Sequence, residues 1–107
     1  MNDVSKIVTI YILILCIFHI LQSNISRFFA TFLLYIFSIY LFHINFKLAC
    51  VYILLGIGAS LTEHIFIKYI NSSWKYQNPN LFTIPIWLIL LWSLAILLIT
   101  ETIKLVK

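Results

Sequence analysis

Residues 48–70, LACVYILLGIGASLTEHIFIKYI, decide the fold of this chain, because they form a nearly unbroken apolar run. A helix needs about 20 mostly apolar residues to cross the hydrocarbon core of a bilayer, and this run is long enough. Its aliphatic and aromatic residues lack the period-two alternation of a transmembrane barrel strand. In lipid the backbone must satisfy its own hydrogen bonds, so the run predicts a membrane-spanning helix.

Three further apolar runs flank this segment, at residues 7–21, 28–46 and 81–106. The first run is short, but it becomes long enough if it begins near Val4 and Lys6 extends toward the headgroups. Short connections favour antiparallel packing of consecutive helices. We therefore predict one all-α domain over residues 1–107, an up-down-up-down bundle of four transmembrane helices with both termini on one side. The predicted spans are 5–22, 28–46, 48–70 and 83–104.

The composition excludes a soluble globular protein. Of the 107 residues, 64% are hydrophobic and 9% are charged, whereas soluble domains are about 45–50% apolar and about 25% charged. The mean hydropathy is +1.10. The net charge of +4 comes from cations scattered near the ends of the apolar runs, which argues against nucleic-acid binding. We expect a multi-pass integral membrane protein whose main partner is the lipid bilayer.

The distribution of Lys and Arg predicts that the termini lie in the cytoplasm. The predicted terminus side carries Lys6, Lys47, Lys104 and Lys107, and the other side carries Arg27, Lys68 and Lys75. Cys16 and Cys50 do not have the spacing of metal ligands, so no metal site is predicted. The pair Gly56 and Gly58 lacks the third glycine of a dinucleotide-binding loop, and no cofactor is predicted.

Glu63 is the main candidate for a functional residue, as a catalytic acid or base. An ionisable side chain inside a span costs a few kcal/mol on insertion scales, so it marks a functional site by default. Gly56, Ala59 and Ser60 share a helical face with Glu63, and such a small face allows another helix to approach closely. We therefore expect Glu63 to face protein. The alternatives are a purely structural carboxylate and use of this face for self-association into a homo-oligomer.

Other polar side chains fall at the same depth as Glu63, when depth is counted at about 1.5 Å per helical residue. We take as candidate substrate-binding residues His19, Arg27, Trp74, Tyr76 and Trp87. A carboxylate surrounded by cations can bind an anionic substrate or relay protons. The alternative is a belt of Trp, Tyr, Lys and Arg at the level of the lipid headgroups.

A loose motif runs from the third span into the fourth: Glu63, then Trp74-Lys75-Tyr76, then Pro85 opening a span that contains Trp87 and Trp92. Over roughly residues 56–92 it resembles polytopic carotenoid-biosynthesis proteins of the hydratase and lycopene-cyclase kinds. The resemblance implies that Glu63 is the acid, and that Trp74, Tyr76 and Trp87 line an isoprenoid site.

Three functions remain open on the sequence. The first is binding of, or chemistry on, a lipid or isoprenoid at Glu63 and the connection 71–82. The second is proton-coupled transport, because the length and four spans resemble small multidrug transporters. Those proteins have their essential Glu in the first span, where this chain has Cys16 and His19. The third is a structural or interaction role without catalysis, and the residues do not decide whether the protein is an enzyme.

Overall fold

The computed structural model describes residues 2–70 and 84–106, and all four long elements in these ranges are α-helices. They are α1 (Asp3–Ile20), α2 (Asn24–Leu41), α3 (Phe46–Ile65) and α4 (Trp87–Val106), with a π-helical turn η1 (Phe66–Ile70) that continues α3. All four helices are long and apolar enough to cross a membrane. The predicted all-α class with four membrane-length helices is thereby confirmed. Trp74 and Tyr76, two of the predicted substrate-binding residues, and the connection 71–82 lie outside the described residues.

Side-chain caps set where the first three helices begin. Asn2, Ser23 and Asn45 each accept a hydrogen bond from the backbone N–H three residues later, over 2.8, 3.1 and 2.8 Å. Such caps satisfy N–H groups that have no partner inside the helix. Because Ser23 caps α2, this helix begins at Asn24 and includes Arg27, whereas the apolar run predicted a start at residue 28.

A left-handed residue ends α2. His43 has φ of 56°, and the N–H of Ile44 returns to the carbonyl of Ile39 over 2.9 Å. This is the Schellman arrangement, which satisfies the last helical carbonyls. It ends α2 at Leu41, earlier than the predicted residue 46, and places Lys47 inside the first turn of α3.

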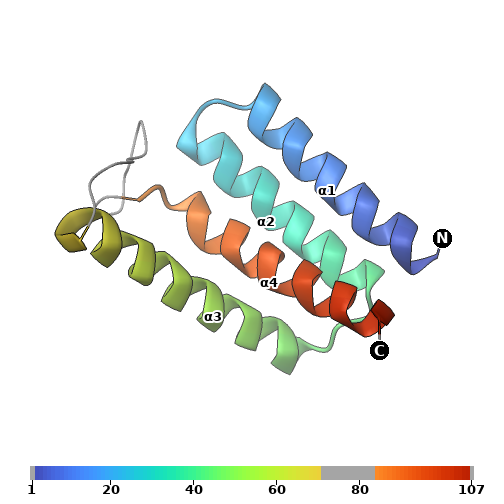
Figure 1. Ribbon diagram of the computed structural model, residues 1–107. Helices are drawn as coiled ribbons and strands as arrows, with labels where there is room; N and C mark the ends of the chain where they lie inside the picture. The colour runs from blue at the N-terminus through green and yellow to red at the C-terminus, as the bar shows by residue number, and fades with distance from the viewer. Residues whose placement is uncertain (1, 71–83, 107) are drawn as a thin grey trace.

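The ribbons of consecutive helices run in opposite directions, with α4 between α2 and α3 (Figure 1). Among the described residues, α4 packs against all three other helices, and its most extensive contact is with α3. The helices α2 and α3 are joined by a short connection, yet α4 lies between them along most of their length. Near that connection, Tyr35 of α2 donates a hydrogen bond of 2.6 Å to the carbonyl of Ala49 on α3.

The buried side chains form two clusters at the two ends of α4. The cluster near the termini is the larger and consists of Ile7, Ile10, Leu34, Tyr35, Ile44, Ala49, Tyr52, Leu94, Leu97 and Leu98. The cluster at the start of α4 consists of Ile67, Ile84, Trp87 and Leu88, with Phe18, Phe28, Leu91 and Trp92 packed on it. This second cluster supports the candidate site.

Small residues bring α3 and α4 together between these clusters. A Cβ atom added to Gly56 would collide with Ser93 Oγ and would lie 2.6 Å from the carbonyl oxygen of Ile89. Ser60, one turn further along α3, is also buried. The small face predicted from the sequence is therefore used to pack α3 on α4, and it positions Glu63 on the same side of α3.

Candidate functional site

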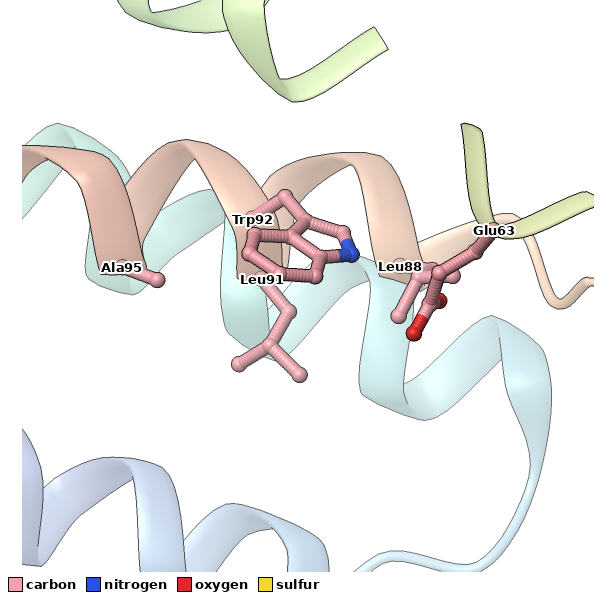
Figure 2. Close-up of a pocket in the computed structure, with 5 residues that line it drawn as sticks. All are labelled: Glu63, Leu88, Leu91, Trp92 and Ala95. Atoms are coloured by element: carbon pink, nitrogen blue, oxygen red, sulfur yellow. The ribbon is translucent and has the colours of Figure 1, made fainter. Parts of the chain in front are cut away.

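Glu63 lines a pocket of about 210 Å³ between α3 and α4. The other lining residues are Leu88, Leu91, Trp92 and Ala95, which come from successive turns of α4. In Figure 2 the Glu63 carboxylate lies beside Leu88, while Leu91 and Ala95 extend along α4 away from it. The pocket thus has one ionisable end and an otherwise apolar wall of aliphatic and indole side chains.

The local sequence explains this geometry. Glu63 follows Gly56 and Ser60 on the α4-facing side of α3, so the close approach of the two helices fixes its distance from α4. Three residues later α3 passes into the π-helical turn η1. Such turns occur frequently at functional sites. Ile67 in η1 is buried in the same cluster as Trp87 and Leu88, which anchors the helix end that carries Glu63.

The pocket is smaller than the usual small-molecule site, which has a volume of about 300–1,000 Å³. Its size suits one end of a chain-like molecule. The Glu63 side chain is half-buried and interacts with its surroundings, so its contacts hold it in the pocket lining. A carboxylate in such a position can accept hydrogen bonds or pair with a cation when ionised, and it can donate a proton when neutral.

Arg27 and Trp87 form a second group of contacts at the same end of the bundle, and Trp87 shares a buried cluster with Leu88 of the pocket wall. The guanidinium Nε donates to the Leu21 carbonyl over 2.7 Å, and Nη2 donates to the Phe18 carbonyl over 3.1 Å. Its Cζ atom lies 5.0 Å from the Phe18 ring centroid and 5.5 Å from the Trp87 ring. The two rings meet edge to face with centroids 4.8 Å apart. We call Phe18, Arg27 and Trp87 the aromatic–guanidinium cluster.

Asn24 joins this cluster to α4, because its Oδ1 accepts a hydrogen bond of 3.0 Å from Trp87 Nε1. Sequence reasoning missed both Asn24 and Phe18. Phe18 was one apolar residue among many in its span. Asn24 carried a usable signal, since a buried indole N–H seeks a hydrogen-bond acceptor.

The structure brings only some of the predicted site residues together. Arg27 meets Trp87, but no ion pair joins Arg27 to Glu63 within the described residues. His19 is exposed, and its carbonyl accepts a hydrogen bond from the Gln22 side chain. Trp74 and Tyr76 are outside the described ranges, so their place at the site stays a prediction.

At the opposite end of the bundle, Glu101 pairs with Lys104 over 2.8 Å, as the three-residue spacing indicates. Across residues 2–70 and 84–106, no group of three or more His, Cys, Asp or Glu could hold a metal ion. No protein-family model, curated protein or solved structure matches the chain. The interpretation of the site therefore depends on its own geometry.

Proposed function

We propose that the protein binds a lipid or isoprenoid by placing its polar end against Glu63 and its chain along the apolar wall of the pocket. One observation supports this most directly. A single carboxylate stands at the end of a pocket otherwise lined by Leu88, Leu91, Trp92 and Ala95, between two membrane-length helices. An ionisable side chain inside a membrane span is a candidate functional residue by default.

The chemistry of Glu63 narrows the ligand class. An ionised carboxylate only accepts hydrogen bonds, so it favours a head that donates, such as an alcohol or an amine. A carboxylate head would meet repulsion from a like charge in a medium of low dielectric constant. An alcohol is also the head that an acid at Glu63 could protonate, which is how the proposal extends to catalysis. The resemblance to carotenoid-biosynthesis proteins makes an isoprenoid chain the first choice of probe.

In the orientation favoured by the Lys and Arg counts, the termini lie in the cytoplasm and the pocket lies near the opposite leaflet. A ligand drawn from the bilayer would then enter sideways, between helices, with no need for a path through the protein. This route distinguishes the proposal from proton-coupled transport, which requires access from both faces of the membrane.

The experiment uses photoactivatable isoprenoids with the same chain and three different heads, an alcohol, an amine and a carboxylate. The protein is labelled in bilayers, and the attachment sites are mapped by mass spectrometry. We expect the alcohol and the amine to label the wall formed by Leu88, Leu91 and Trp92, and the carboxylate to label it less. In Glu63→Gln this discrimination should disappear, because the charge is removed at nearly constant shape.

Glu101→Gln is the matched control, because it removes a carboxylate at the other end of α4. It should leave the labelling pattern unchanged. Equal labelling by all three probes in the wild-type protein would show that Glu63 does not select the head. Labelling spread evenly over the lipid-facing residues would remove the pocket as a binding site and favour a structural role.

A further inference from the structure

Arg27 is a half-buried cation, and no carboxylate among residues 2–70 and 84–106 lies within ion-pair distance of it. The chain has three acidic residues, and within the described residues Asp3 and Glu101 lie against Lys6 and Lys104. The third, Glu63, is not within ion-pair distance of Arg27. The sequence of residues 71–83 contains no Asp or Glu that could serve instead. No carboxylate of residues 2–70 and 84–106 therefore pairs with Arg27, and an anion from outside the chain can take that place.

The guanidinium is held in one place with donors to spare. Two of its N–H groups bond to the carbonyls of Leu21 and Phe18 at the end of α1. An arginine side chain has five such donors, so three remain. The rings of Phe18 and Trp87 lie within cation–π distance and restrict the side chain further. A phosphate group binds well to N–H donors that are held in one plane, as the remaining donors of Arg27 are.

Arg27 also lies at a defined depth. It stands in the first turn of α2, at the end of a helix whose length matches the hydrocarbon core. The anions available at that level of a bilayer are the phosphates of lipid headgroups. Neighbouring Ser23 and Ser26 are exposed at the same helix start, so a headgroup can approach from the bilayer side.

We propose that Arg27, held by Phe18 and Trp87, binds the phosphate of an anionic phospholipid at the α1–α2 end of the bundle. This site shares no lining residue with the Glu63 pocket, although Trp87 and the pocket wall both belong to α4. The bound lipid would stabilise the junction of α1, α2 and α4, since each of these helices contributes a residue or carbonyl that holds Arg27.

The sequence offers a direct test, because Arg27 is the only arginine. Arginine labelled with ¹³C at Cζ gives one guanidinium signal in solid-state NMR of the intact protein in phosphatidylglycerol bilayers, prepared in a phosphate-free buffer. We expect dephasing of this signal by lipid ³¹P at a distance that fits a guanidinium–phosphate hydrogen bond. Absence of dephasing would overturn the proposal. Dephasing that requires added inorganic phosphate would overturn the lipid assignment in favour of a free anion.

A second measurement compares the phospholipid that stays bound after extraction into a mild, uncharged detergent. Arg27→Lys keeps the charge but has three donors instead of five and lacks the planar fork that contacts a phosphate through two N–H groups. We expect its lipid retention to fall about tenfold, the equivalent of one charge-assisted hydrogen bond. Lys47→Gln removes an exposed cation from the first turn of α3 and should leave retention unchanged. Equal phospholipid retention in Arg27→Lys and wild type would contradict the proposal. Glu63→Gln should retain phospholipid as the wild type does, so the outcome for the Arg27 site does not depend on the pocket proposal.

Discussion

Gly56→Ala tests whether the contact between α3 and α4 holds the bundle together. The added methyl group would collide with Ser93 Oγ and would stand 2.6 Å from the Ile89 carbonyl oxygen and 3.0 Å from Ser93 N. Carbon atoms in ordinary contact are about 3.5–4.0 Å from their neighbours, so the helices must separate by about 1 Å. Two of the three obstructing atoms belong to the backbone of α4 and cannot rotate away.

The magnitude follows from two opposing terms. Overpacking of this kind costs about 1–3 kcal/mol. Replacing glycine by alanine inside a helix gains up to about 1 kcal/mol in helix propensity. Gly58→Ala is the matched control, because a Cβ atom at Gly58 meets nothing within 4 Å. The propensity gain is common to both variants, so the difference between them isolates the steric term.

The measurement is reversible unfolding in mixed micelles of a mild detergent and dodecyl sulfate, followed by circular dichroism. We expect Gly56→Ala to lower the free energy of unfolding and Gly58→Ala to leave it equal or raise it, with a difference of about 1–3 kcal/mol. Probe labelling at Trp92 should weaken in Gly56→Ala, because Glu63 moves away from the wall of the pocket. Equal stability of the two variants would refute the close packing of α3 on α4.

Two further predictions use the same unfolding measurement in mixed micelles. Tyr35→Phe removes the hydrogen bond to the Ala49 carbonyl and should cost about 0.5–1.5 kcal/mol. Tyr52→Phe should be neutral, since the buried Tyr52 hydroxyl has no hydrogen-bond partner in the described part of the chain, and equal losses in both variants would contradict the assignment. His43→Gly should raise stability by about 1 kcal/mol, because a left-handed conformation is strained for any residue with a Cβ atom. A loss of stability there would show that the His43 side chain matters more than the strain.

Hydropathy predicted the four helices because the requirement for lipid-facing apolar residues acts on every turn of a span. It located the helix ends less well. α2 begins at Asn24 because the Ser23 hydroxyl accepts a hydrogen bond, and it ends near His43 because the backbone turns left-handed. The start and the end of α2 each depend on a single polar or strained residue, and the mean hydropathy of an apolar run is not sensitive to single residues.

The sequence predicted the depth of the candidate residues in the membrane, but not which neighbouring helix each side chain faces. Counting residues along each helix placed Glu63 and Arg27 at the same level. In the structure, the start of α2, which carries Arg27, and the end of α3, which carries Glu63, lie at the same end of the bundle (Figure 1). Which side chains meet depends on helix order and rotation, and α4 lies between α2 and α3. Arg27 therefore meets Phe18 and Trp87, while Glu63 meets the wall formed by α4.

The central position of α4 has a consequence for how the protein is made. Because α4 follows the other three helices along the chain, α1, α2 and α3 leave the ribosome before the helix against which each of them packs. Until α4 arrives, Gly56 lacks its close contact with Ile89 and Ser93, which is the tight packing that small residues provide between membrane helices. Insertion of α4 is thus the step that joins the other three helices, and a ribosome that stalls before it leaves three inserted helices without their common partner.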